Sequence, residues 1–406
     1  MARSRSKVRR ALVHVLGAGL ASLCTPALAH ASASPAALQR AADRLVADGV
    51  PGVIAIERQG SREWRVASGV ADLRTGAPIR VNDRYRIGSI TKSFVSAVVL
   101  QLVGEGRLSL RDTVAKWVPG LVPHGDSITV DELLHHTSGI PDYADARFVL
   151  NVYHDPLRPW TPRQLVAYAV DHPPLFPPGT QWSYSNTNYV LLGLIIDAVD
   201  RVPPTLEEEG PAREVYGREI VPLHLEHTSF PLHDPGLPSP FAHGDLIDAP
   251  KEWDLPGLLD TTRMDPSSAW TAGGIVGTID DVARFHRALF GGRLLRPAQQ
   301  EELEATVQIA PGLAYGAGVE KLQTPCGVAW GHDGSTPSSV DLSLTSPDGA
   351  RQLVIALTRD ARTWSAQTFT DVTHAYLTGY CGRRVSRTAA RSLARHVTRR
   401  LLALHG

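Results

Sequence analysis

The sequence predicts an α/β fold of the α+β type, in which one antiparallel sheet packs on helices and a helical lobe is inserted into the chain. Runs of strand-forming residues lie towards both ends of the 406-residue sequence, and the region 107–270 between them is rich in proline, glycine and helical patterns. Strands at both ends with helices between them imply one sheet built from both ends of the chain. The expected domain is 34–382, with a sheet lobe of 34–90 and 275–382 and a helical lobe of 91–274.

The N-terminal part of this domain is predicted to hold a helix, a hairpin and a second helix. "PAALQRAADRLVADG" (35–49) has apolar residues at helical spacing and ends on a glycine. "GVIAIERQG" (52–60) and "REWRVASGVA" (62–71) are strand-like runs around a tight polar turn. The stretch "SITKSFVSAVVLQLVGEG" (89–106) is apolar almost all round, which is typical of a buried helix.

The later part is predicted to complete the sheet. "NYVLLGLIIDAVD" (188–200) is the clearest buried helix of the inserted lobe. Three runs, "GVAWGHDG" (327–334), "SVDLSLTSP" (339–347) and "RQLVIALTR" (351–359), have the pattern of an antiparallel meander. "WSAQTFTDVTHAYLTG" (364–379) follows as a closing helix.

The first 33 residues have the pattern of a secretory signal peptide. "MARSRSKVRR" is basic, "ALVHVLGAGLASL" is apolar, and "ALAHASA" offers small residues at the spacing that signal peptidases cleave. We therefore expect residues 1–33 to be removed and the mature protein to be secreted or to act outside the cell envelope. The pair Arg9-Arg10 leaves open whether export uses the general or the twin-arginine route.

The cysteine content predicts one disulfide bond in the mature protein. Beyond the signal peptide only Cys326 and Cys381 occur, and in an exported chain they are expected to form one disulfide; two buried free thiols are the alternative.

The formal net charge is zero, so no nucleic-acid partner is expected. We expect a monomer. The basic tail 383–406 is predicted either to contact anionic lipid or wall polymer weakly or to be a solvated tail.

Ser89 and Lys92 are the first candidates for chemistry. Only five of the 41 basic residues are lysine, and lysine, unlike arginine, can give up its proton in a protein. Lys92 follows Ser89 by three residues, which places both on one face of the predicted helix. A serine with a neighbouring buried amine has the parts of a nucleophile and its base. A capping serine followed by an exposed lysine is the alternative.

Two further short motifs are rarer. Tyr184-Ser185-Asn186 is the one place where a tyrosine has asparagine two residues later, and His332-Asp333-Gly334 is the one place where a histidine has glycine two residues later. The first is also compatible with a polar turn before a helix, and the second with a turn at a strand end.

These motifs in this order resemble the serine hydrolases related to class C β-lactamases. The resemblance also rests on "DRYRIGSITKSF", "LLHHTSGIPDY" and "PPGTQWSYSNTNYVLLGLIIDAV", spans nearly all of residues 35–382, and is strongest to the secreted D-alanyl-D-alanine carboxypeptidase of Streptomyces. It implies a β-lactamase or penicillin-binding transpeptidase-like fold. The implied activity is D-alanyl-D-alanine carboxypeptidase on peptidoglycan peptides, with acylation by β-lactams. A β-lactamase, an esterase, a D-amino-acid amidase or a non-turnover penicillin-binding receptor are the alternatives.

The resemblance also implies roles for single residues. Ser89 would be the nucleophile, Lys92 and Tyr184 would move its proton, and Asn186 would hydrogen-bond the substrate amide. Backbone N–H groups of Ser89 and of Ser335, just after Gly334, would form the oxyanion hole.

Substrate selection is expected from the third motif and from two aromatic residues. His332 would help to bind a substrate carboxylate, whereas Asp333 departs from the threonine or serine usual in relatives and leaves the specificity open. Phe148 and Trp270 are expected either to line the pocket or to lie in the core. No cofactor or metal is expected; the adjacent His135 and His136 lack a ligand-spaced partner and favour a structural role.

Overall fold

The protein is described here by a computed structural model that covers residues 35–201, 203, 209–383, 385–388 and 390. All of these residues belong to a unit that begins at Ser32. The signal peptide and most of the basic tail lie outside the described residues, so both stay predictions.

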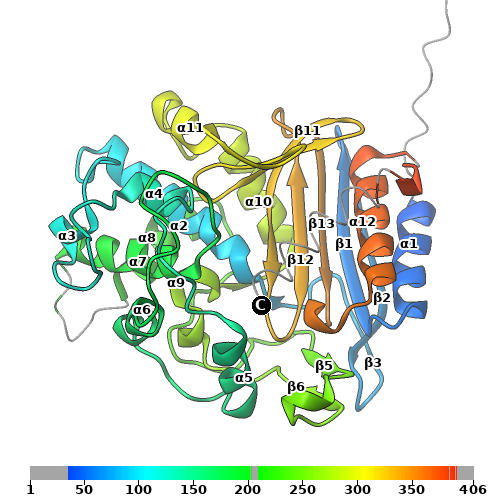
Figure 1. Ribbon diagram of the computed structural model, residues 1–406. Helices are drawn as coiled ribbons and strands as arrows, with labels where there is room; N and C mark the ends of the chain where they lie inside the picture. Colours follow the sequence, from blue (N-terminus) through cyan, green and yellow to red (C-terminus); the bar gives the residue numbers. More distant parts are fainter. Residues whose placement is uncertain (1–34, 202, 204–208, 384, 389, 391–406) are drawn as a thin grey trace, which may run out of the picture. The chain divides into compact units, whose positions relative to one another are not determined.

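Nine strands form one antiparallel sheet in the order β3-β2-β1-β13-β12-β11-β10-β9-β8 (Figure 1). The strands are β1 Gly52–Gln59, β2 Arg62–Asp72, β3 Ala77–Pro78, β8 Val307–Ala310, β9 Leu313–Tyr315, β10 Glu320–Thr324, β11 Gly327–Ser335, β12 Val340–Thr345 and β13 Arg351–Leu357. The two ends of the chain meet where β1 pairs with β13, with Val53 opposite Leu357. The predicted sheet, including its hairpin and its meander, is confirmed.

Helices cover both faces of this sheet. On one face lie α1 (Pro35–Ala47) and α12 (Ala366–Cys381), and on the other lies α10 (Ile279–Phe290) (Figure 1). Along β1, Val53 and Ala55 belong to one hydrophobic core, and Ile54 and Ile56 belong to the other. A strand buried on both faces needs apolar residues at successive positions, which explains why "GVIAI" does not alternate.

The helical region is built around α2 (Thr91–Gly104) and α7 (Asn186–Asp200), which are buried almost all round as predicted. The other helices are α3 Val114–Trp117, α4 Val130–Leu134, α5 Ala146–His154, α6 Pro162–Val170, α8 Glu209–Val215, α9 Trp270–Gly273 and α11 Pro297–Glu304. Short helical turns are η1 Gly88–Ile90, η3 Tyr216–Ile220, η4 Lys251–Trp253, η5 Pro266–Ser268 and η6 Ala361–Thr363. Within the described ranges no helix is both long and apolar enough to cross a membrane. The lobe boundaries stay predictions.

Two small antiparallel pairs lie outside the main sheet. One joins β4 (Tyr85–Arg86) to β7 (Val276–Gly277), and the other joins β5 (Asp245–Ile247) to β6 (Leu258–Asp260). The first pair matters for function, because β4 leads directly into the turn that carries Ser89.

The expected disulfide between Cys326 and Cys381 is present. It joins the last residue of α12 to the turn before β11, although the two cysteines are 55 residues apart in sequence. The disulfide thus links the start of β11, the strand that carries the His332 motif, to the end of α12.

Glu57 is a buried carboxyl group within the sheet. Its side chain is 0% exposed, Gln59 donates a hydrogen bond to Oε1, and Oε2 has no partner among the described residues. Burial raises the pKa of Glu57 to about 7. The folded protein therefore holds this proton more tightly than the unfolded chain does. The resulting stability is complete below pH 4.5, the ordinary value, and is lost as pH rises through about 7.

Replacing Glu57 by glutamine is expected to reduce the fall in the free energy of unfolding with rising pH. The free energy of unfolding of the unmodified protein should fall by about 2 kcal/mol more than that of the variant between about pH 5 and about pH 9. Urea unfolding at a series of pH values measures the difference. Parallel pH profiles for the two proteins would show that Glu57 does not change its protonation on folding.

Candidate active site

Ser89 lies in η1, where β4 ends and α2 begins. Gly88 before it has φ +50°, and a Cβ there would come within 2.8 Å of the backbone nitrogen of Ser335. Gly334 is equally confined, since a Cβ on it would lie 2.3 Å from the carbonyl oxygen of Ile87. Two glycines thus let the end of β11 approach the serine. The first and third sequence motifs meet at this point.

Lys92 is fully buried one turn further along the helix. Its Nζ lies 3.0 Å from Ser89 Oγ, 2.8 Å from Asn186 Oδ1 and 2.6 Å from the carbonyl oxygen of Ala272. Amide and carbonyl oxygens only accept hydrogen bonds, so two N–H bonds of the amine point to them. Towards Ser89 Oγ the amine can present either its third N–H or a lone pair. This geometry allows Lys92 to give or to take the serine proton.

Tyr184 approaches the same oxygen from another side. Its Oη lies 2.9 Å from Ser89 Oγ, and Lys92 Nζ lies 4.9 Å from the centre of its ring. The ring packs on His136 at a centroid distance of 4.3 Å, and the backbone N–H of Ser185 donates to His136 Nδ1. His136 therefore positions the tyrosine, in line with the structural role expected for it.

Asn186 is held by Asp142, a residue that sequence reasoning missed. The backbone N–H of Asn186 donates to Asp142 Oδ1 (3.0 Å), and its Nδ2 donates to Oδ2 (2.9 Å). This fixes the amide so that its oxygen faces Lys92. Burial raises the pKa of Asp142, while hydrogen bonds from Ala144 and Asn186 and the charge of Lys92 act in the opposite direction. The signal available was Asp142 itself, within "LLHHTSGIPDY".

Changing Asp142 to asparagine is expected to lower the acylation rate of Ser89 by about 10- to 100-fold, the usual effect of losing a hydrogen bond to a charged group. An asparagine would present an NH₂ group to one of the two N–H donors of Asn186, so the amide that orients Lys92 would turn. Stopped-flow acylation by a chromogenic β-lactam measures the rate. Asp145→Asn, on the same segment but capping α5, is the matched control. Equal rates in both variants would exclude a positioning role.

A cavity of about 120 Å³ opens beside Ser89. Of the predicted site residues, Ser89, Tyr184, Asn186, Ser335 and Phe148 line it. Arg86, Asp333 and Arg362 also line it, although the sequence did not single out the two arginines. Trp270 is 1% exposed and belongs to the hydrophobic core, the second of the two places expected for it.

His332 lies behind this wall. It is 1% exposed, its Nε2 lies 2.9 Å from Tyr315 Oη, and its Nδ1 lies 2.5 Å from the carbonyl oxygen of Asp333. The carboxylate of Asp333 is 3.4 Å from the same Nδ1. Among the described residues of this motif, Asp333 and not His332 lines the cavity.

In the part of the chain that the structure describes, Glu320, His332 and Asp333 bring three donor atoms within 4.8 Å of one another. His332 already engages Tyr315 and the backbone of Asp333 with its two ring nitrogens. Neither nitrogen is then free for a cation, so the chemistry of this donor set does not fit a metal ion.

Comparison with known families identifies the chain. Residues 38–358 match the family described as Beta-lactamase. The chain belongs to the beta-lactamase family. The fold and the serine-hydrolase class expected from the sequence are those of this family.

Relatives of this beta-lactamase-family chain differ in their named activities. Penicillin-binding protein 4* of Bacillus subtilis (strain 168) is 26% identical over 323 residues, which are 75% of this chain and 67% of the relative. Esterase EstB of Burkholderia gladioli is 30% identical over 263 residues, which are 59% of this chain and 65% of the relative. The chain thus spans about two thirds of these two proteins, and it spans 35% of other curated relatives that it matches.

Among solved structures, a D-stereospecific amidohydrolase from Streptomyces sp. is similar with a TM-score of 0.75 and 36% identity, over 86% of this chain and 99% of that chain. The beta-lactamase-family protein is therefore a serine hydrolase of this fold. The finer resemblance to the secreted Streptomyces D-alanyl-D-alanine carboxypeptidase stays a prediction.

Proposed function

We propose that this chain hydrolyses amide bonds of D-configured substrates through an acyl-enzyme on Ser89. The observation that carries the proposal is the triangle at Ser89 Oγ, with Lys92 Nζ at 3.0 Å and Tyr184 Oη at 2.9 Å. Both are within reach for proton transfer to or from a nucleophile. The similarity to a D-stereospecific amidohydrolase supports the choice of substrate.

In the proposed reaction Ser89 Oγ attacks the carbonyl carbon, and its proton passes to the Lys92–Tyr184 pair. The two groups titrate together, so the proton belongs to the pair. Backbone N–H groups of Ser89 and Ser335 stabilise the oxyanion. The C–N bond then breaks as the pair protonates the leaving amine. Water releases the acyl group by the reverse proton path. The second Nδ2 hydrogen of Asn186 bonds the substrate amide.

Two kinds of leaving group fit this scheme. A D-alanyl-D-alanine carboxypeptidase, the activity on peptidoglycan peptides that the family resemblance implies, releases an amine that carries a carboxylate. A D-amino-acid amidase releases ammonia. A leaving-group carboxylate placed beside Asp333 would be opposed by this acidic side chain of the cavity wall, which favours the second kind. A Ser89-dependent penicillin adduct without turnover of any peptide would instead make the chain a penicillin-binding receptor.

The test uses purified protein and Ser89→Ala. Intact mass is recorded over time with a fluorescent penicillin, and hydrolysis is measured for an N-acyl-D-Ala-D-Ala peptide and for the same peptide with a C-terminal carboxamide. We expect Ser89-dependent acylation and a preference for the carboxamide that falls in Asp333→Thr. A preference for the free acid would instead assign carboxypeptidase activity. Absence of any Ser89-dependent adduct or hydrolysis would overturn the proposal.

Export and surface contact complete the proposal. We propose that the mature chain acts outside the cytoplasm as a monomer, and that its basic tail 383–406 contacts anionic lipid or wall polymer. The disulfide between Cys326 and Cys381 supports an oxidising location. Fractionation of cells that express the full chain tests the location.

A further inference from the structure

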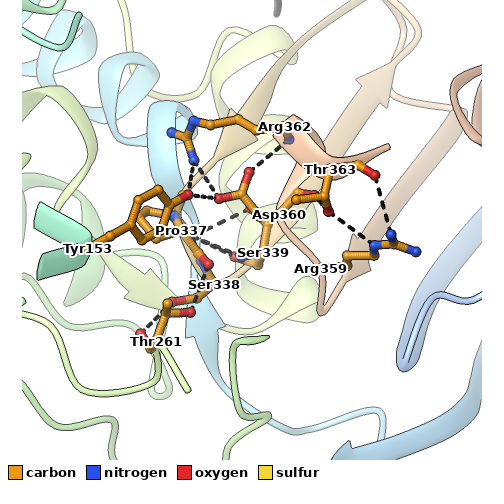
Figure 2. A network of polar contacts seen from close by, with 10 residues as sticks. Tyr153, Thr261, Pro337, Ser338, Ser339, Arg359, Asp360, Arg362 and Thr363 are labelled. Carbon is orange, nitrogen blue, oxygen red and sulfur yellow. Dashed lines mark hydrogen bonds and ion pairs between the residues drawn. The ribbon is translucent and has the colours of Figure 1, made fainter. Parts of the chain in front are cut away.

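Arg362 lines the same cavity as Ser89. Of its three guanidinium nitrogens, only Nη1 forms hydrogen bonds with described residues. Nη1 lies 2.8 Å from Tyr153 Oη and 2.5 Å from Asp360 Oδ2. Nε is buried without a partner among the described residues, and no described residue bonds Nη2 either. Figure 2 shows the nitrogen that faces Tyr153 and Asp360, with the other two turned away from them.

The hydrogen bonds of Nη1 fix the plane of the guanidinium group, and with it the orientation of Nε and Nη2. Asp360 is 0% exposed and accepts hydrogen bonds from the backbone N–H of Arg362 (2.8 Å) and from Tyr153. Arg362 itself is 10% exposed. A guanidinium group locked in this way presents its Nε and Nη2 hydrogens as a parallel pair, the geometry that matches the two oxygens of a carboxylate. Buried donors of this kind normally have a partner.

A second guanidinium group, that of Arg86, lies in the wall of the same cavity. Arg86 donates from Nη2 to the carbonyl oxygens of Pro235, Thr262 and Met264, while its Nε and Nη1 are buried without partners among the described residues. Burial lowers the pKa of Arg86 to about 10, so it is charged at neutral pH. Asp333 is the acidic side chain of the described cavity wall, and Asp360 pairs with Arg362 on the side held by Nη1.

The rest of the wall is largely apolar. Phe148, Val149 and Val152 of α5 line it, together with Met264 and Pro266. A pocket beside the nucleophile suits the acyl half of a substrate, because this half stays bound to Ser89 after the leaving group departs. A substrate with an apolar stem and an acidic end would match both the apolar wall and the open guanidinium edge.

We propose that Arg362 is a binding residue for a carboxylate carried on the acyl half of the substrate. The inference rests on the proposed acyl-enzyme at Ser89. The chemical class is an acyl group in which an apolar stem joins the reactive carbonyl to a free carboxylate. The Nε and Nη2 hydrogens of Arg362 bind its two oxygens.

The test uses p-nitrophenyl monoesters of straight-chain diacids from succinate to suberate. Each is compared with the ester of equal length that ends in a carboxamide, and kcat/KM is measured by release of p-nitrophenolate. At one or two chain lengths the carboxylate is expected to be preferred by about tenfold or more, as for other hydrogen bonds to charged groups. The preferred length reports the span from Ser89 to Arg362.

Arg362→Lys keeps the charge beside Asp360 but removes the paired donors, so the preference should fall to about threefold or less. Arg359→Lys is the matched control, because Arg359 bonds Gly49 and Thr363 (Figure 2 shows the second contact) and does not line the described cavity. It should keep the preference. Equal hydrolysis of both series at every length by the unmodified protein would overturn the inference. Absence of Ser89-dependent hydrolysis of either series would instead overturn the proposed acyl-enzyme.

Discussion

Lys92→Arg is expected to slow acylation of Ser89 by about 10²- to 10⁴-fold, the range attributed to a general acid–base group. Arginine keeps the positive charge but cannot lose its proton in a protein. The amine of Lys92 has oxygen acceptors on two sides and Ser89 Oγ on the third, so its role in the proposal is to exchange a proton in that third direction. Single-turnover acylation by a β-lactam, followed by intact mass, measures the rate.

The larger side chain of arginine needs a control, because Lys92 is fully buried. Lys92→Met has nearly the shape of lysine without its charge, and the melting temperature of each variant reports the cost of the change to the fold. We expect both variants to be slow. An arginine variant that acylates within tenfold of the unmodified protein would show that charge, and not proton exchange, is what Ser89 needs.

The fold was largely predictable because local patterns carry it. The runs that form β1, β2 and β11 to β13 are strand-like by themselves, and α2 and α7 are apolar enough to be recognised as buried helices. The pairing of β1 with β13 needed one further step, the requirement that strands at both ends of the chain share a sheet. No local pattern sets the exact ends of the lobes.

The candidate site was predictable where spacing along one element determines contact. Ser89 and Lys92 meet because residues three apart share a helix face. Asp142 reaches Asn186 across 44 residues of sequence, and no periodicity links the two. Arg362 was equally hidden, because its function depends on a cavity wall built from several distant segments. For His332 and Asp333, strand alternation separates neighbours but does not tell which one meets the cavity.

Tyr184→Phe is expected to lower the acylation rate by about 10²- to 10³-fold with little change in fold. The change removes the hydroxyl group 2.9 Å from Ser89 Oγ and keeps the ring that packs on His136. Because the tyrosine oxygen is the second partner of the serine in the proposed proton path, Lys92 alone would have to accept the proton and deliver it to the leaving group. A substrate with a good leaving group depends less on this proton transfer, because its leaving group departs as an anion.

The leaving group therefore provides the decisive measurement. The loss in kcat/KM should be larger for an amide than for a p-nitrophenyl ester of the same acyl group, since p-nitrophenolate leaves without a proton. Tyr189→Phe is the matched control. Tyr189 lies on α7, the helix that follows Tyr184, and its buried hydroxyl group donates a hydrogen bond to the carbonyl oxygen of Leu134. We expect Tyr189→Phe to reduce both rates equally or not at all. If Tyr184→Phe also lowered the two rates by the same factor, the tyrosine would serve to position Ser89, and the proton for the leaving amine would have to come from Lys92.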